Sequence, residues 1–123
     1  MKVLVYLLLA AALLLAAADV NVTGKWSGTF STDDGSDSGS AVVILKQTGH
    51  QITGSGGSEE DPSWPIEKGT VTGNKVNIEV KRPDGTLYKC DLVVDGDHLK
   101  GAVAVTTPDG QAIKGKLDLA RVK

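Results

Sequence analysis

The chain has 123 residues, of which 23% are charged and 4% aromatic, and its formal net charge is −2. This length suits one domain with a single core. The mildly acidic balance argues against a basic surface for nucleic acids or anionic membranes, and the scarcity of aromatic side chains leaves no platform for stacked bases. The single cysteine, Cys90, excludes a disulfide within the chain.

The N-terminal segment has the pattern of a signal peptide. Lys2 precedes an apolar run over residues 3–18, and three alanines end this run before Asp19. As a helix the run would extend about 24 Å, whereas a helix that spans a bilayer needs roughly 20 apolar residues, or about 30 Å. We therefore expect residues 1–18 to be removed, leaving a periplasmic or secreted domain of residues 19–123. A retained signal anchor is the alternative, and only then would the protein be attached to a membrane.

Beyond the leader, glycine-centred turns alternate with segments of alternating apolar and polar residues. Gly adopts positive φ without strain, and Asn, Asp and Pro favour turns, so this rhythm predicts an antiparallel meander. The turns are Thr48-Gly49-His50, Gly56-Gly57-Ser58, Thr72-Gly73-Asn74, Pro83-Asp84-Gly85, Asp95-Gly96-Asp97 and Pro108-Asp109-Gly110. The predicted strands are Lys25–Ser31, Ala41–Gln47, Gln51–Ser55, Pro65–Thr72, Lys75–Arg82, Thr86–Val94, His98–Thr106 and Gln111–Val122. Two longer polar loops are expected over Thr32–Ser40 and Gly56–Trp64.

Side chains two residues apart share one face of a strand, and this parity collects one apolar face. The expected inward set is Trp26, Gly28, Phe30, Ala41, Val43, Leu45, Val76, Ile78, Val80, Tyr88, Cys90, Leu92, Val94, Leu99, Gly101, Val103, Val105, Ile113, Gly115, Leu117, Leu119 and Arg121. Gly28 is expected to leave room between the two rings beside it. The second strand is ambiguous, because Val42 and Ile44 make its other face apolar as well.

An apolar face on a continuous meander must be covered or must close on itself. No segment of helical periodicity follows residue 18 to cover it. The sequence therefore predicts an all-β fold, a single antiparallel up-and-down meander of about eight strands closed into a β-barrel. A β-sandwich is the alternative.

Two features at the ends of the inward face resemble the calycins, the group of lipocalins and their relatives. Gly24-Lys25-Trp26 opens the first strand, and Arg121 closes the last strand with inward parity. In that group a Gly-x-Trp packs across the closed end of the barrel and a basic residue of the last strand lies against the indole. The resemblance implies a calycin-like barrel in which Trp26 and Arg121 form a structural plug, with a ligand-binding role for the pair as the alternative. The exported part also resembles short bacterial periplasmic domains of uncharacterised function, which share the units at 71–76 and 94–101.

Residues that could carry chemistry are few and isolated. His50 and His98 each lie at the edge of a turn and lack a second ligand at the spacing of a metal pair. The acidic segment 33–37 departs from the residue order of a calcium loop, and 59–61 has the pattern of another solvated loop. No catalytic triad, nucleophile elbow or phosphate-binding loop is recognisable. We expect no catalytic activity, metal or cofactor, and we expect Cys90 to be a buried apolar residue.

The function expected from these observations is that of a non-catalytic exported β-barrel binding domain, whose partner is an unidentified protein or a small apolar ligand. One alternative is a carrier, which would need an interior cavity of roughly several hundred Å³. Another is a periplasmic protease inhibitor, because one bacterial inhibitor family is a barrel of similar length with a Gly-x-Trp start. Such inhibitors insert an N-terminal segment into the protease, whereas here only Asp19 to Thr23 precede Gly24.

Overall fold

The computed structural model describes residues 20–123, and the predicted signal peptide lies outside these residues. They form eight strands: β1 (Gly24–Thr32), β2 (Ser38–Thr48), β3 (Gln51–Gly57), β4 (Trp64–Thr72), β5 (Lys75–Lys81), β6 (Leu87–Asp95), β7 (His98–Thr106) and β8 (Ala112–Arg121). The predicted strand boundaries agree to within three residues. The described part of the chain contains no helix that is long and apolar enough to cross a membrane.

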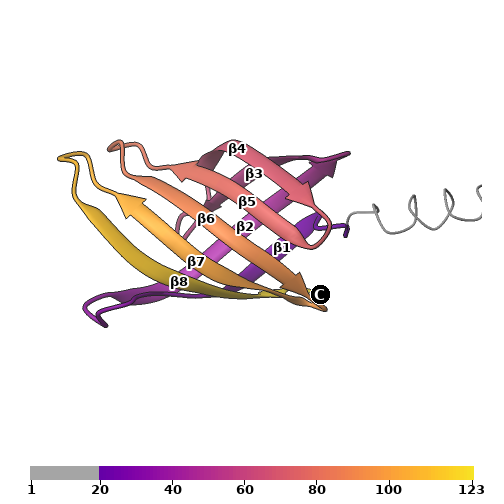
Figure 1. Cartoon of the computed structure of the whole chain (residues 1–123), viewed down its shortest axis with the longest axis horizontal. Helices are drawn as coiled ribbons and strands as arrows, with labels where there is room; N and C mark the ends of the chain where they lie inside the picture. Colours follow the sequence, from indigo (N-terminus) through magenta and orange to yellow (C-terminus); the bar gives the residue numbers. More distant parts are fainter. Residues whose placement is uncertain (1–19) are drawn as a thin grey trace, which may run out of the picture.

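Every strand pairs antiparallel with the next one along the chain, and β8 returns to pair with β1 (Figure 1). The closing seam runs from the pair Trp26 and Arg121 to the pair Thr32 and Gly115. The predicted closed up-and-down barrel is thereby confirmed, and the β-sandwich alternative is wrong. Closure leaves no unpaired sheet edge among the eight strands.

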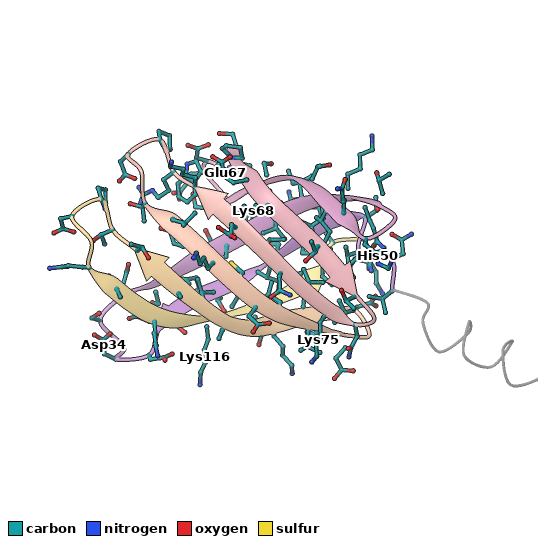
Figure 2. The ribbon with its side chains drawn as sticks, turned by 45° about the horizontal axis from the view of Figure 1, so that its top comes forward. Asp34, His50, Glu67, Lys68, Lys75 and Lys116 are labelled. Atoms are coloured by element: carbon teal, nitrogen blue, oxygen red, sulfur yellow. The ribbon has the colours of Figure 1, made fainter. Side chains whose placement is uncertain are left out.

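The two ends of the barrel differ in their connections. At one end, turns of two residues begin with Gly49, Gly73 or Gly96, each at a φ of 61–63°, as the favoured hairpin turns require. At the other end lie longer loops over 33–37, 58–63, 82–86 and 107–111. We call these the closed end and the open end. In Figure 2, His50 marks the closed end and Asp34 the open end.

The predicted parity places the apolar face inside the barrel. The buried core includes all the expected inward residues of β2 and β5 and those of β6 and β7 other than Tyr88 and Gly101, which are partly buried. Leu45, Ile78, Leu92 and Leu99 are each at most 2% exposed. Ile113 has inward parity but is 36% exposed, because it lies near the open rim. The four further core members Val22, Val42, Ile52 and Val71 were not in the predicted inward set.

Gly28 is needed for a different reason from the predicted one. A Cβ at this position would lie 1.9 Å from the backbone oxygen of Asp118 on β8. No real Cβ approaches an oxygen so closely, so any side chain at Gly28 would push apart the seam that closes the barrel. The close approach of two backbones, and not the space between two rings, requires the glycine.

The ambiguity of β2 is resolved by the loop over 58–63. Val42 points outward yet is 1% exposed, whereas Ile44 is 42% exposed. The loop folds over Val42: Ser27, the β1 partner of Val42, donates from Oγ to Glu59 Oε1 at 2.7 Å, and the backbone N of Glu59 donates to Ser40 Oγ at 3.1 Å. A polar loop thus buries one apolar side chain on the outside of the barrel.

Candidate functional site

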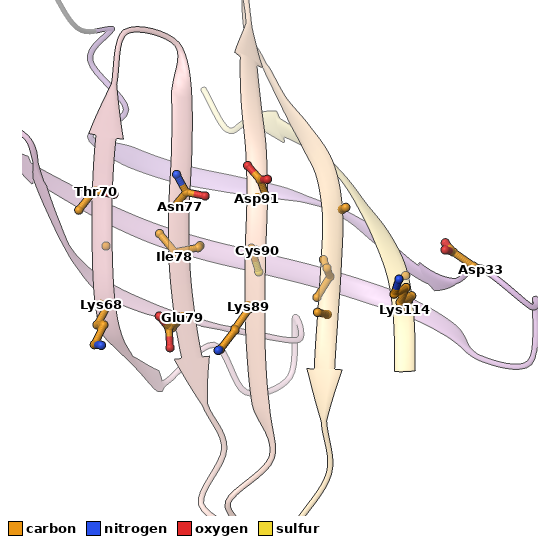
Figure 3. A pocket seen from close by; sticks show the side chains of 15 residues that line it. Asp33, Lys68, Thr70, Asn77, Ile78, Glu79, Lys89, Cys90, Asp91 and Lys114 are labelled. Atoms are coloured by element: carbon orange, nitrogen blue, oxygen red, sulfur yellow. The ribbon is translucent and has the colours of Figure 1, made fainter. Parts of the chain in front are cut away.

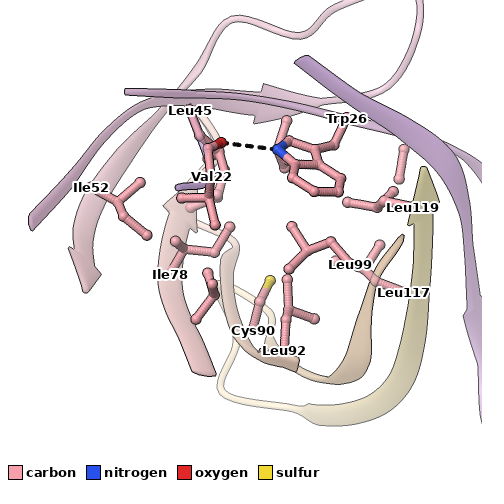
Figure 4. Close-up of a cluster of buried hydrophobic side chains, with 14 of the residues drawn as sticks. Val22, Trp26, Leu45, Ile52, Ile78, Cys90, Leu92, Leu99, Leu117 and Leu119 are labelled. Atoms are coloured by element: carbon pink, nitrogen blue, oxygen red, sulfur yellow. Dashed lines mark hydrogen bonds between the residues drawn. The ribbon is translucent and has the colours of Figure 1, made fainter. Parts of the chain in front are cut away.

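Trp26 and Arg121, the two residues predicted to form a plug or a ligand site, meet at the closed end. Trp26 is fully buried, and its Nε1 donates to the carbonyl of Val22 at 3.0 Å (Figure 4). Cζ of Arg121 lies 4.2 Å from the centroid of the Trp26 ring. The same guanidinium donates to the carbonyls of Thr23 at 3.1 Å and Asn21 at 3.0 Å. A planar guanidinium can combine stacking with such donation, which an ammonium cannot.

The chain before β1 crosses and fills this end. Val22 is fully buried, and its backbone N donates to Gln47 Oε1 at 2.8 Å. The backbone N of Val20 donates to the carbonyl of Gly73 at 2.9 Å. The segment 20–23 is therefore held by β1, β2, β8 and the turn after β4. Neither Trp26 nor Arg121 lines either of the two hollows that follow.

Three aromatic side chains gather at the open end instead. Trp64 and Tyr88 stack with 6.0 Å between ring centroids and 12° between planes. Phe30 meets Tyr88 edge-on at 6.3 Å. All three are only partly buried. Cζ of Arg82 lies 4.7 Å from the centroid of the Trp64 ring, which places one cation on the aromatic group.

A hollow of about 130 Å³ leads from these rings into the barrel. Beside Phe30, Trp64 and Tyr88 its walls include Ala41 and Gly56, and it reaches Cys90 in the core. An apolar cavity of about 150 Å³ is enough to hold benzene, whereas sites for larger ligands usually measure about 300–1,000 Å³. The open end can therefore accept one ring or one branched alkyl group.

A second hollow, of about 540 Å³, lies on the outer face over β4 to β8. Figure 3 shows its polar side chains in rows across the strands, including Lys68, Glu79 and Lys89. Glu79 is the cross-strand partner of both lysines. Charges of alternating sign on a solvated sheet face support strand pairing and create no concentrated field. The aromatic hollow at the open end is therefore the better candidate site.

The loops around the open end are strongly acidic. Loops 33–37, 58–63, 82–86 and 107–111 contain eight of the fifteen acidic residues of the chain, with Arg82 as their only Lys or Arg. Their formal net charge is −7. By contrast, the two-residue turns at the closed end contain one carboxylate, Asp97, which lies 3.6 Å from Arg121 Nε.

Hydrogen bonds within the loops hold several of these carboxylates in place. Donation from Ser36, first from its side chain and then from its backbone, lowers the pKa of Asp34 to about 2. The side chain of Ser63 likewise lowers the pKa of Asp61. The carboxylates at 84 and 109 have lowered pKa values for the same reason, through Thr86 and Thr107. Hydrogen bonds to the charged form favour ionisation, so these four carboxylates keep their negative charge in mildly acidic solution.

The remaining candidates for chemistry are dispersed. His50 lies in the turn between β2 and β3 and His98 is the first residue of β7, and within residues 20–123 no three His, Cys, Asp or Glu residues gather as metal ligands. The carboxylate of Asp34 accepts hydrogen bonds from Ser36 of its own loop. Cys90 is buried as predicted, and desolvation raises the pKa of its thiol to about 12, which leaves almost no nucleophilic thiolate.

Sequence reasoning overlooked the open end. The sequence predicts a loop over Gly56–Trp64, whereas Trp64 is the first residue of β4. The available signal was topological: in a meander, the ends of odd strands and the starts of even strands lie together. That rule places Phe30, Trp64 and Tyr88 at one end of the barrel.

Comparison of the chain with protein-family models, curated proteins and solved structures finds no match. The geometry of the two ends therefore carries the functional argument alone.

Proposed function

We propose that the protein is a non-catalytic exported binding domain of calycin-like architecture, which binds its partner at the open end. The observation that carries this proposal is the aromatic hollow formed by Phe30, Trp64 and Tyr88. Partly exposed aromatic side chains around an apolar cavity are typical of binding sites. A partner would place a single ring or branched alkyl group in this hollow.

The closed end supports the same assignment by contrast. Trp26 and Arg121 are engaged in binding residues 21–23 of the chain itself. In this proposal Trp26 and Arg121 form a structural plug, and the ligand binds at the open end instead.

The two alternatives are less well supported. A carrier of the usual kind needs a larger cavity than about 130 Å³, so any small molecule carried here would be the size of one ring. A protease inhibitor that acts through its N-terminal segment needs that segment free, whereas Val20 and Val22 are hydrogen-bonded to the barrel.

The proposal can be tested with toluene as a single-ring probe. The two indole N–H signals in a ¹H–¹⁵N spectrum report the two ends, because Trp26 lies at the closed end and Trp64 at the open end. We expect toluene to shift the Trp64 signal and to leave the Trp26 signal in place. An unchanged Trp64 signal at saturating toluene would refute the proposal.

A matched pair of variants identifies the hollow as the binding place. Ala41→Leu adds a larger side chain to the wall of the hollow, whereas Ala102→Leu makes the same change on the exposed outer face of β7. We expect the first to abolish the toluene shift and the second to preserve it. The Trp26 signal checks that the fold is intact in both.

A further inference from the structure

The charge of the open end indicates what kind of partner enters it. The four loops with a formal net charge of −7 lie at the same end of the barrel as the aromatic hollow, and Ser58 of one of them contributes to its wall. Charges concentrated around a low-dielectric cavity focus the field and attract a partner of opposite sign. A neutral hydrophobic molecule would gain nothing from this field, whereas a cationic one would be drawn into it.

The carboxylates that shape this field are fixed in position. Asp34 accepts hydrogen bonds from Ser36, Asp61 from Ser63, and Asp84 from the backbone of Thr86. Preorganised charges lose little conformational entropy when a partner binds, which favours electrostatic recognition. Glu60 and Asp33 are also exposed at this end.

The protein already shows that its open-end indole accepts a cation. The guanidinium of Arg82 lies 4.7 Å from the Trp64 centroid, at the rim of the hollow. A lysine or arginine from a partner would meet the acidic loops beside this Arg82–Trp64 pair. Apolar and cationic groups together are therefore the chemistry that this end recognises.

We infer that the open end docks a basic polypeptide, which inserts one apolar side chain into the hollow and places flanking Lys or Arg residues against the acidic loops. This inference rests on the proposed function, since it names the partner of the same hollow. A polypeptide fits better than a small organic cation. The hollow holds only one side chain, while the surplus of negative charge spans four loops and calls for several positive charges on one partner.

The test uses the peptide acetyl-Gly-Lys-Lys-Phe-Lys-Lys-Gly-amide and three comparison probes. The first replaces Phe by Gly, the second replaces each Lys by Glu, and the third is phenethylammonium, a small cation with the same ring. Affinity is measured by calorimetry and by the Trp64 indole shift, from about 20 to about 300 mM salt. We expect the Lys/Phe peptide to bind at least about tenfold more tightly than each comparison probe. Its affinity should fall as salt screens the loops.

Variants separate the acidic loops from general charge effects. The double variant Asp33→Lys/Glu60→Lys reverses two charges at the open end, and Asp95→Lys/Asp118→Lys reverses two exposed charges elsewhere on the barrel. We expect the first to weaken peptide binding about tenfold and the second to change it less than about twofold. Equal effects of the two double variants would overturn the inference.

The outcomes distinguish this inference from the proposed function. If toluene shifts Trp64 but the Lys/Phe peptide binds no more tightly than phenethylammonium or the Gly peptide, the hollow is a binding site and the polypeptide inference is wrong. If toluene leaves Trp64 unshifted, the proposed function is itself wrong, whatever the peptide does.

Discussion

Val22 provides a sharp test of the closed end, because it precedes the first strand and would ordinarily be regarded as part of a linker. Its side chain is fully buried, and its backbone N and O are both hydrogen-bonded, to Gln47 and to the indole of Trp26. Val22→Ala keeps both backbone bonds and removes only buried apolar groups. Burial contributes about 0.8 kcal/mol for each methyl group removed, and the cavity left behind adds to this loss. The free energy of unfolding should therefore fall by about 2 kcal/mol.

The matched control is Val93→Ala, because Val93 is 41% exposed on the outer face of β6. This substitution should cost less than about 1 kcal/mol. Urea unfolding followed by tryptophan fluorescence measures both, and Val22→Ala should also lower the melting temperature by about 10 °C. If the two variants lost equal stability, residues 20–23 would not be part of the folded core, and the account of the plug would fail.

Three further predictions concern the core, the thiol and acid. Ile78→Asp should unfold the barrel by burying an unpaired carboxylate, whereas Glu79→Lys on the outer face should change stability by less than about 0.5 kcal/mol; circular dichroism distinguishes them, and similar effects would contradict the assigned faces. Cys90, with its thiol pKa raised to about 12, should resist alkylation until urea unfolds the protein, so rapid labelling of the native state would contradict its burial. The pKa of Asp34 is lowered to about 2, so its contribution to stability is present above the pKa of the unfolded chain and is lost as pH falls from about 4 to about 2. Asp34→Asn should therefore flatten the dependence of the urea midpoint on pH in that window. An unchanged slope would argue against the Ser36 hydrogen bonds.

The sequence was informative wherever local rules decide the structure. A glycine that opens a two-residue turn, as at Gly73, sets the hairpin register, and the period of two then assigns every side chain to a face. The prediction of the barrel rested on these regularities, which need no knowledge of distant contacts. The contact between Arg121 and Trp26 is implied by the resemblance to calycins and not by the strand pattern; in the structure the two residues pair across the seam that closes the barrel.

The sequence was less informative where the chain departs from regular pairing. The register between β3 and β4 shifts between Gln51 and Ser55, and that between β4 and β5 shifts between Ile66 and Lys68. The loop that buries Val42 on the outside depends on hydrogen bonds between segments more than ten residues apart. Such contacts leave no periodic signal. The order of the strands gathers Phe30, Trp64 and Tyr88 at one end of the barrel, but the packing of these rings and the loops beside them could not be built from the pattern.

The concentration of charge at the open end also has a consequence for stability. Like charges on neighbouring loops repel one another in the folded state, and a surface selected only for stability would mix the two signs. We therefore expect Asp33→Lys/Glu60→Lys to leave stability unchanged or to raise it, while weakening binding of the basic peptide. Added salt should raise the melting temperature of the wild-type protein more than that of this variant, because screening removes repulsion that the variant has already lost. Urea unfolding at low and high salt measures both effects. A variant that is less stable than wild type at low salt would show that these carboxylates support the fold, and the acidic end would then have a structural explanation in place of a functional one.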